Sequence, residues 1–238
     1  MNRWIERPGW GKLEAMQPPP LPASWPYAPR PALEPPERRE EAVLPGLPGT
    51  WQLEAVPGLE LGPAEHRMGR AYGRGGVFRA GDAVLRPYRR GGLVRHVNAA
   101  VYLSPDRFEQ EFQVHRALWS AGLPTVEPLG WACRRRLWGW EGVYLTRFAE
   151  GTPWPRAWDS PQVLPGLRTL LGALCAWGLH APDLNATNVL VAPGGGILAL
   201  DWDRAAWCGR PDLPERYRRR LRRSLAKLGA PEALQAQI

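Results

Sequence analysis

Three side chains that carry oxygen ligands surround a short predicted hairpin and could together support phosphoryl transfer. Asp183 and Asn188 lie five positions apart, just before the apolar run VLV at 189–191. Asp201 directly follows a second apolar run, ILAL, and the linking sequence APGGG is typical of a turn. Because a hairpin brings its outer ends together, we expect the three side chains to converge. An amide and a carboxylate suit Mg²⁺, and the other carboxylate could serve as a base, which is what transfer from ATP needs.

Each of these residues taken alone has a simpler explanation. Asx turns at a surface hairpin use the same residue types and need no ligand. The order carboxylate, amide, carboxylate around one hairpin favours the phosphoryl-transfer site over three unrelated turns.

A glycine-rich segment, GRAYGRGGVF, precedes a strand predicted at 83–86. Glycine lets backbone N–H groups approach phosphates closely, although glycine hairpins without ligands are also common. Arg86 lies eleven positions after Gly75 on the predicted strand, where a cation could meet the α- and β-phosphates of a nucleotide.

A helix is predicted from Ser104, a suitable N-cap, with Pro105 at the first helical position. Apolar residues at positions 108, 112, 114, 117 and 118 keep a helical period. Glu111 lies next to the apolar stripe, so it could reach inward and pair with Arg86. The alternative is that Glu111 is an ordinary solvated helix charge.

The surrounding elements predict an α+β fold with two lobes. Short strands, the last at 143–148, indicate a β-rich N-terminal lobe over residues 46–148. A connector at 149–158 and a buried helix over Leu164 to Leu179 open a smaller helical lobe over 149–238. Residues 1–45 are rich in proline and charge, so we expect most of this segment to be extended or loosely docked. It could contact a proline-binding partner or be an ordinary tail.

Composition limits the partners and the compartment. The 238 residues carry a net charge of +8, which favours anionic partners such as nucleotides, phosphorylated sugars, anionic membranes or nucleic acid. The three cysteines, Cys133, Cys175 and Cys208, form no metal motif and suit a reducing cytoplasm. No stretch has the length and apolar character of a signal peptide or membrane span.

Two motifs make the chain resemble a known family. The stretch 183–190, DLNATNVL, and the stretch 200–204, LDWDR, are similar to the 3-deoxy-D-manno-octulosonic acid (Kdo) kinases of the lipopolysaccharide kinase group, which have the protein-kinase-like fold. The usual family texts are DLNAHN and DFDR. Three further stretches agree in order: LRPYRRGG at 85–92, RFEQEF at 107–112 and GLP at 122–124. The resemblance covers residues 68 to 228.

The resemblance implies a role for each candidate residue. Asp183 would be the catalytic base, while Asn188 and Asp201 would hold Mg²⁺. Arg86 would replace the usual strand lysine and pair with Glu111. The glycines that would cover the phosphates of ATP are Gly73, Gly75 and Gly76. The expected activity is ATP-dependent phosphorylation of a sugar hydroxyl, with Kdo or a related lipid-linked sugar as acceptor.

The sequence departs from the family pattern at three positions. The family usually has His two residues before the catalytic Asp, whereas this chain has Ala181, with His180 one residue earlier. Thr187 replaces the His before the Asn, and Trp202 replaces the Phe of the second motif.

The end of the chain predicts a basic amphipathic helix over 215–228, with apolar positions 217, 221, 225 and 228 and seven basic residues at other positions. Mostly this is a packing helix, but its charged face also offers a peripheral contact with anionic lipid at the inner face of the cytoplasmic membrane. Only 37 residues follow Asp201, which argues against the large helical subdomain of peptide kinases.

Two alternatives stay open. One is a small-molecule kinase of the aminoglycoside or choline type, which shares the catalytic loop. The other is a catalytically inactive kinase-fold scaffold that binds an anionic partner, against which the intact Asp183, Asn188 and Asp201 count. The basic runs lack interleaved aromatic residues, which counts against nucleic acid as the partner.

Overall fold

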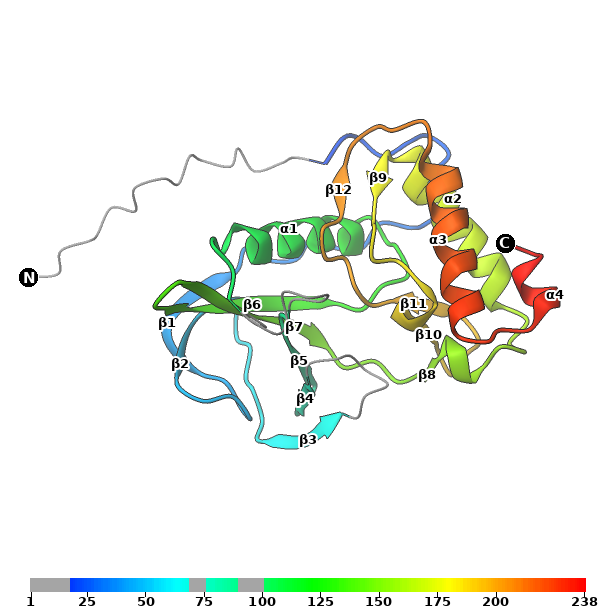
Figure 1. The fold of residues 1–238 in the computed structure, drawn as a ribbon. Helices are drawn as coiled ribbons and strands as arrows, with labels where there is room; N and C mark the ends of the chain where they lie inside the picture. The colour runs from blue at the N-terminus through cyan, green and yellow to red at the C-terminus, as the bar shows by residue number, and fades with distance from the viewer. Residues whose placement is uncertain (1–17, 69–75, 90–100) are drawn as a thin grey trace, which may run out of the picture.

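A seven-stranded antiparallel sheet forms the N-terminal part of the molecule (Figure 1). The computed structural model describes residues 18–68, 76–89 and 101–238, without the side chains of 65–68. The strand order is β1-β2-β6-β7-β5-β4-β3. The strands are β1 (Glu37–Val43), β2 (Thr50–Ala55), β3 (Ala64–Met68), β4 (Val77–Ala80), β5 (Ala83–Pro87), β6 (Pro128–Arg136) and β7 (Gly139–Arg147).

Helix α1 (Asp106–Ser120) covers one face of this sheet. Phe108 and Phe112 pack there against Trp131 of β6 and Tyr144 of β7. Gly142 permits this close approach, because a Cβ atom at that position would lie 2.5 Å from the Phe108 ring. The opposite face carries a separate apolar cluster that includes residues of β2, β5 and β6.

The start of α1 differs by one residue from the prediction. Pro105 is the N-cap residue rather than the first helical position, and Asp106 begins the helix. The Ser104 hydroxyl still accepts a hydrogen bond, at 3.1 Å, from the Asp106 N–H. Ser104 therefore still binds an N–H group of the first helical turn, although it lies one residue before the N-cap.

The N-terminal segment is more ordered than predicted over its described part. Trp25 donates a hydrogen bond to the Ala121 carbonyl at 2.7 Å, and Arg30 donates to the carbonyls of Trp119 and Leu123. Residues 37–43 then form β1 instead of an extended tail. A charged run is compatible with an edge strand, because its backbone pairs with β2 while most of its side chains stay exposed. Residues 1–17 lie outside the described residues.

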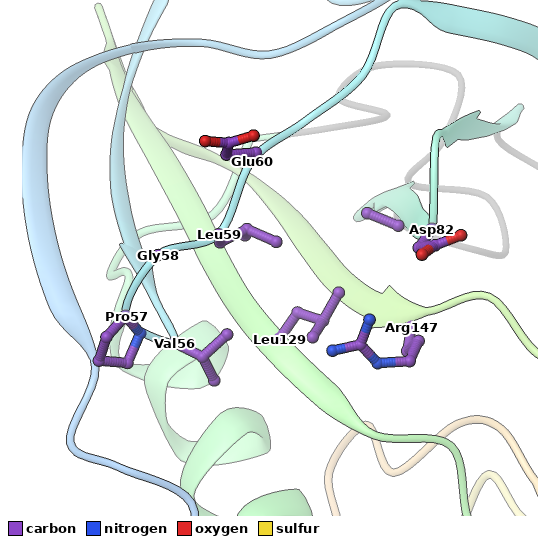
Figure 2. A pocket seen from close by; sticks show the side chains of 9 residues that line it. Val56, Pro57, Gly58, Leu59, Glu60, Asp82, Leu129 and Arg147 are labelled. Atoms are coloured by element: carbon purple, nitrogen blue, oxygen red, sulfur yellow. The ribbon is translucent and has the colours of Figure 1, made fainter.

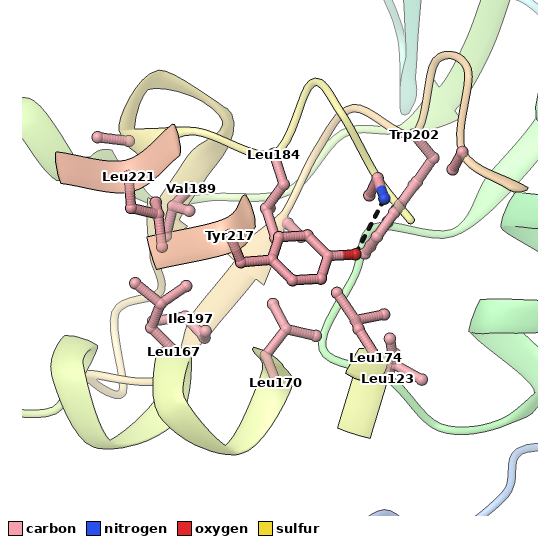
Figure 3. Packing of buried hydrophobic residues seen from close by; sticks show 14 of the residues in the cluster. Leu123, Leu167, Leu170, Leu174, Leu184, Val189, Ile197, Trp202, Tyr217 and Leu221 are labelled. Atoms are coloured by element: carbon pink, nitrogen blue, oxygen red, sulfur yellow. Dashed lines mark hydrogen bonds between the residues drawn. The ribbon is translucent and has the colours of Figure 1, made fainter. Parts of the chain in front are cut away.

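The C-terminal part is mainly helical. Its helices are α2 (Val163–Ala176), α3 (Leu213–Lys227) and α4 (Glu232–Gln235). The short elements between them are η3 (Trp154–Arg156), η4 (Ala186–Asn188), β8 (Thr152–Pro153), β9 (Leu179–His180), β10 (Val189–Val191), β11 (Ile197–Ala199) and β12 (Ala206–Trp207). Figure 3 shows side chains of α2 and α3 packed together in this core, with Leu170 beside Tyr217.

The predicted helix over 164–179 ends earlier, at Ala176. Gly178 adopts a φ of 69°, in the left-handed region that stops a helix. Leu179 and His180 then form β9, which pairs with β12. The chain thereby leaves α2 in an extended form and leads directly into the loop that contains Asp183.

The α+β architecture, with its β-rich N-terminal part and helical C-terminal part, is confirmed. Helix α1 contributes to both cores, because Val114 and Leu118 belong to the C-terminal cluster. A bridge between Thr125 and Ala199 also connects the two parts. Within the described ranges, no helix is both long enough and apolar enough to cross a membrane.

Candidate active site

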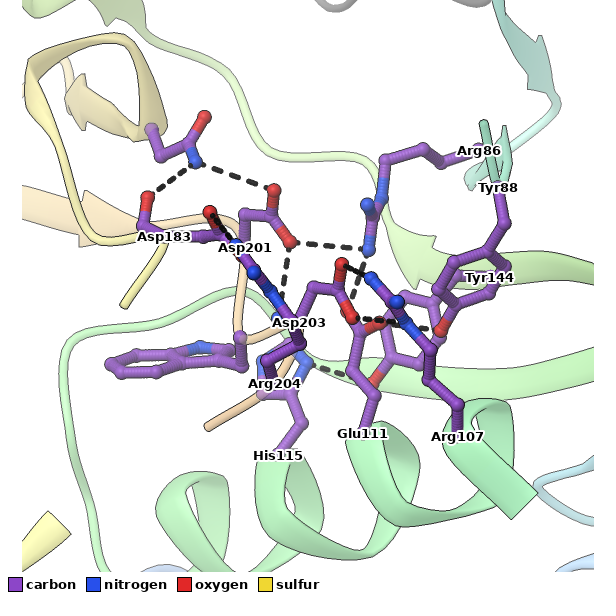
Figure 4. A network of polar contacts seen from close by, with 12 residues as sticks. Arg86, Tyr88, Arg107, Glu111, His115, Tyr144, Asp183, Asp201, Asp203 and Arg204 are labelled. Atoms are coloured by element: carbon purple, nitrogen blue, oxygen red, sulfur yellow. Dashed lines mark hydrogen bonds and ion pairs between the residues drawn. The ribbon is translucent and has the colours of Figure 1, made fainter. Parts of the chain in front are cut away.

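The predicted hairpin is confirmed, and it brings the three candidate residues together. Strands β10 and β11 pair antiparallel, with Val189 opposite Ala199. The Asn188 amide donates to the backbone carbonyl of Asp183 at 2.9 Å and to the Asp201 carboxylate at 3.3 Å (Figure 4). The convergence that the sequence predicted from spacing alone is therefore present.

The loop before the hairpin is held by its own side chains. Asn185 caps η4 by accepting a bond from the Thr187 N–H at 2.9 Å, and its amide donates to the Asp183 carbonyl at 2.7 Å. The two asparagines therefore share one backbone carbonyl and limit the movement of Asp183.

Tyr217 of α3 also holds this loop through its hydroxyl, a role that its place in the sequence does not reveal. The Ala181 N–H donates to the Tyr217 hydroxyl at 2.9 Å, a bond marked in Figure 3. That hydroxyl in turn donates to the Leu179 carbonyl at 2.7 Å. Ala181 itself is buried, where the family usually has His. The helical stripe containing position 217 was visible in the sequence, but the polar end of the tyrosine gave no signal of its own.

Arg86 of β5 and Glu111 of α1 lie within salt-bridge distance, as predicted. Arg86 Nη2 lies 2.5 Å from Glu111 Oε1, and the Tyr88 hydroxyl donates to Glu111 Oε2. The same Arg86 nitrogen lies 3.3 Å from Asp201 Oδ1. The Glu111 side chain is only 1% exposed, so the alternative of a solvated helix charge is wrong. Arg86 thus connects the buried carboxylate of α1 with the candidate metal ligand.

Burial shapes the protonation of this pair. It raises the pKa of Glu111 to about 8, with Asp201 and Asp203 acting in the same direction and Arg86 and Tyr88 opposing. Burial acts to lower the pKa of Arg86, but the neighbouring carboxylates, Asp201 first, raise it well above its usual value. Arg86 is therefore a permanent cation at the centre of the site.

A second ion pair ties α1 to the segment after β11. Arg107 donates to both carboxylate oxygens of Asp203, with Nε 2.9 Å from Oδ1. The Asp203 N–H in turn donates to Asp201 Oδ1 at 3.2 Å. Both residues lie in motifs of the sequence, at 107–112 and 200–204, but nothing in those motifs indicates that they pair.

Trp202 is fully buried between the two aspartates and anchors them to the core. Its indole N–H donates to Thr125 Oγ1 at 2.8 Å, and that hydroxyl donates to the Ala199 carbonyl at 2.7 Å. The hydroxyl has a single proton, so His115 Nε2, at 2.9 Å, must donate to it. His115 Nδ1 then accepts from the Tyr144 hydroxyl. Burial lowers the pKa of His115 to about 3, which keeps the imidazole neutral.

The carboxylate of Asp183 faces two arginines that the prediction did not include. Arg204 contacts both of its oxygens, with Nη2 at 2.8 Å from each. Arg220 of α3 lies 3.5 Å from Oδ1. These contacts join residues 21 and 37 positions from Asp183, which sequence spacing does not reveal.

The predicted phosphate-covering glycines lie largely outside the described residues. Gly73 and Gly75 belong to the segment 69–75, whereas Gly76 is described and has a φ of 75°. The positive φ suits glycine at this position.

Two cavities lie away from the converging residues. Figure 2 shows one of about 230 Å³, lined by Val56, Leu59, Asp82, Leu129 and Arg147 among others. Ala83 and Leu129 of its lining belong to the cluster on the sheet face opposite α1. The other, of about 570 Å³, lies beside the β10–β11 turn. Because neither cavity is lined by Asp183, Asn188 or Asp201, the arrangement of side chains rather than cavity shape identifies the candidate site.

The donor set fits a hard divalent cation. Asn188 uses its amide nitrogen for the bonds to Asp183 and Asp201, and Oδ1 takes part in neither bond. That oxygen and the Asp201 carboxylate are the ligand types that Mg²⁺ prefers. Groups of three or more His, Cys, Asp or Glu in metal-binding range are absent from the described residues.

The sequence matches both a protein-family model and individual proteins. Residues 55–155 match the model of the lipopolysaccharide kinase (Kdo/WaaP) family. The chain is 32% identical over 206 residues to a 3-deoxy-D-manno-octulosonic acid kinase of Xylella fastidiosa (strain M12), covering 80% of this chain and 77% of the relative. A kinase of the same name from Xanthomonas oryzae pv. oryzae (strain PXO99A) is 31% identical over 183 residues, covering 66% and 68%.

Among solved structures, the chain is similar to WbdD. Monomeric WbdD matches with a TM-score of 0.45 and 16% identity, covering 71% of this chain and 42% of WbdD. A second WbdD crystal structure matches with a TM-score of 0.44 and 18% identity, covering 63% and 34%. This chain therefore spans well under half of WbdD.

Proposed function

The chain belongs to the lipopolysaccharide kinase (Kdo/WaaP) family, and from this premise we propose that it phosphorylates a hydroxyl of Kdo or of a related sugar in a lipopolysaccharide or glycolipid. Its class of activity is that of the family, an ATP-dependent phosphotransferase with a sugar hydroxyl as acceptor. The acceptor sugar and the residue roles below are our proposal. The observation that carries it is the convergence of Asp183, Asn188 and Asp201 beside Arg86.

Asp183 acts as the general base that accepts the proton of the attacking hydroxyl. Its loop is fixed by Asn185 and Asn188, which hold the Asp183 carbonyl, and by Tyr217, which holds the Ala181 N–H. A base held in this way needs little reorganisation when the hydroxyl arrives, which favours proton transfer in the transition state.

Arg86 supplies fixed positive charge where the nucleotide phosphates bind. Glu111 and Tyr88 orient its guanidinium from the α1 side, while Asp201 contacts it from the hairpin side. We propose that Gly73, Gly75 and Gly76 bind the same phosphates through backbone N–H groups, as the family resemblance implies; of the three, only Gly76 lies within the described residues. Asn188 Oδ1 and Asp201 would hold Mg²⁺, which when bound neutralises charge on the phosphates. An N-lobe of residues 46–148 and a C-lobe of 149–238 belong to the same proposal, since the Arg86–Asp201 contact would then join the lobes at the nucleotide.

The protein works in the cytoplasm under this proposal, with a peripheral contact at the inner face of the cytoplasmic membrane. The support comes from α3, on which Arg219, Arg222 and Arg223 are exposed while Tyr217 and Leu221 are buried. A cationic face of this kind suits an anionic surface that carries a lipid-linked acceptor.

The experiment is a phosphoryl-transfer assay with Mg·ATP and either free Kdo or a Kdo-bearing lipid. Asp183→Asn should lower turnover by about 10²- to 10⁴-fold while binding of Mg·ATP survives, because the base acts in the transition state. Asp159→Asn, at an exposed carboxylate directly after the connector, is the matched control and should keep wild-type turnover. If the wild-type protein binds Mg·ATP but phosphorylates neither acceptor, the inactive scaffold becomes the better explanation.

A further inference from the structure

Two arginines that the proposed reaction does not use hold the carboxylate of Asp183. Arg204 contacts it through Nε at 3.1 Å and Nη2 at 2.8 Å, and Arg220 approaches within 3.5 Å. Figure 4 shows the Arg204 side chain extending toward Asp183. The Asp183 side chain is 19% exposed, whereas those of Arg204 and Arg220 are 56% and 39% exposed. Both arginines are therefore more exposed than the candidate base that they contact.

Arg204 has a backbone conformation that residues other than glycine rarely adopt. Its φ of 59° is the only positive value at a non-glycine position within the described residues. The chain turns here, and the Ala205 N–H donates to the Trp202 carbonyl at 2.9 Å. The left-handed conformation costs free energy for a side chain with a Cβ atom and is often retained where function requires it.

Arg220 has unused binding capacity at the same place. Its Nε is buried and has no hydrogen-bond partner among the described residues, which is unfavourable unless a ligand or water supplies one. The three hydrogen bonds of Arg204 to Asp183 use Nε and Nη2, and none of them involves Nη1. The single negative charge of Asp183 therefore faces the two positive charges of Arg204 and Arg220, so these three side chains together leave one positive charge without a counterion.

We propose that Arg204 and Arg220 bind the carboxylate of an acidic sugar acceptor and so determine the specificity of the reaction. The inference rests on the proposed function, because it assumes that a hydroxyl approaches Asp183 for proton transfer. A hydroxyl within hydrogen-bond distance of that carboxylate lies beside both guanidinium groups, so an acid group on the same sugar can reach them. The planar guanidinium matches a carboxylate with two parallel hydrogen bonds. In this arrangement the acceptor's acid group binds the arginines while its hydroxyl meets Asp183.

A pair of acceptors tests this assignment. Free Kdo carries the carboxylate, and its carboxamide is neutral at the same position with nearly the same shape. The wild-type protein should favour the acid in kcat/KM by about ten- to a hundredfold, which is the range of charge-assisted hydrogen bonds. Binding of both acceptors beside a non-hydrolysable ATP analogue, measured by calorimetry, should show the same preference.

The variants are chosen to keep the fold. Arg204→Asn suits the positive φ, because Asn tolerates the left-handed region, and Arg204→Lys keeps the charge without the fork. Arg220→Gln is matched by Arg218→Gln, an exposed arginine of the same helix that pairs with Glu215. Arg204→Asn and Arg220→Gln should bring the preference for the acid close to one, mainly through KM. Arg204→Lys should keep part of it, and Arg218→Gln should keep all of it. Thermal unfolding checks that every variant is folded.

The outcomes separate the two levels of the proposal. An equal loss on both acceptors would mean that the arginines serve the loop or the transferred phosphoryl group, and the acid-binding site would be overturned. Absence of turnover by the wild type on both acceptors would overturn the proposed function. In that case the calorimetric preference for the acid, and its loss in Arg204→Asn, would still decide whether the site binds acid groups.

Discussion

Glu111 determines how the stability of the site depends on pH. Its carboxyl ionises near its usual pKa of 4.5 in the unfolded chain, but burial raises the pKa to about 8 in the folded protein. Between these values the folded state binds one proton more than the unfolded state. Stability should therefore fall as pH rises from about 5 to about 8.

Glu111→Gln removes this titration and keeps a hydrogen-bonding group at the same place. We expect the wild type to lose free energy of unfolding relative to this variant as pH rises from 5 to 8, measured by urea unfolding at several pH values. Glu232→Gln, at an exposed carboxylate of α4, should follow the wild type throughout. A difference between wild type and Glu111→Gln that is constant over this range would contradict the assignment.

Asp201 and Asp183 should differ in their effect on nucleotide binding. Asp201 contacts Arg86 and Asn188, each at 3.3 Å, so its proposed role is to hold Mg·ATP as well as to support turnover. Asp201→Ala should weaken binding of ATP in the presence of Mg²⁺ and have a smaller effect in its absence. Nucleotide titrations with and without Mg²⁺ measure this. Equal affinity of Asp201→Ala and Asp183→Asn for Mg·ATP would argue against Asp201 as a metal ligand.

At the scale of elements, the brace from α3 to the catalytic loop depends on one hydroxyl. Tyr217→Phe leaves the Ala181 N–H and the Leu179 carbonyl buried without their partner. We expect a loss of about 1–3 kcal/mol in unfolding free energy and reduced turnover, because an unsatisfied buried polar group is costly and the loop loses its support.

Tyr27→Phe is the matched control. The Tyr27 hydroxyl is also buried but has no partner among the described residues, so its removal should be neutral or stabilising. Denaturant unfolding and steady-state kinetics compare the two variants. If both lose stability equally, the effect of Tyr217→Phe comes from packing rather than from the hydrogen bonds.

At the scale of the whole molecule, the exposed face of α3 should matter only at a membrane. Positions 217, 221 and 225 are buried as predicted, whereas Leu228 is 37% exposed and lies outside the core. Arg216 and Arg220 are half-buried, and the remaining basic residues of the helix are exposed, namely Arg218, Arg219, Arg222, Arg223 and Lys227.

Arg219, Arg222 and Arg223 changed together to Glu should reduce activity on an acceptor embedded in anionic vesicles. Each basic residue near such a surface contributes about 1 kcal/mol of attraction, which salt screens. The variant should keep its stability and its activity on a soluble sugar, because exposed charges contribute little to folding. Kinetics on both acceptors at low and high salt measure this, and an equal loss on both would exclude the membrane role.

The local sequence was sufficient for those features whose partners are close along the chain. The hairpin and the convergence of Asp183, Asn188 and Asp201 follow from apolar runs and turn residues within nineteen positions. The buried stripe of α3 follows from helical spacing. The Arg86–Glu111 pair joins separate elements, and only the family resemblance raised it above an ordinary helix charge.

Tertiary structure alone decided the features that depend on distant partners. The exposed charges of β1 resemble those of a disordered tail, and only pairing with β2 makes that segment a strand. Burial of Tyr217 could be predicted from its period, but its bond to Ala181 depends on how α3 docks under the loop. Arg204 and Arg220 meet at Asp183 because a positive φ at residue 204 and the packing of α3 bring them there. Periodicity specifies which face of an element is buried, whereas the docking of elements determines which polar groups meet.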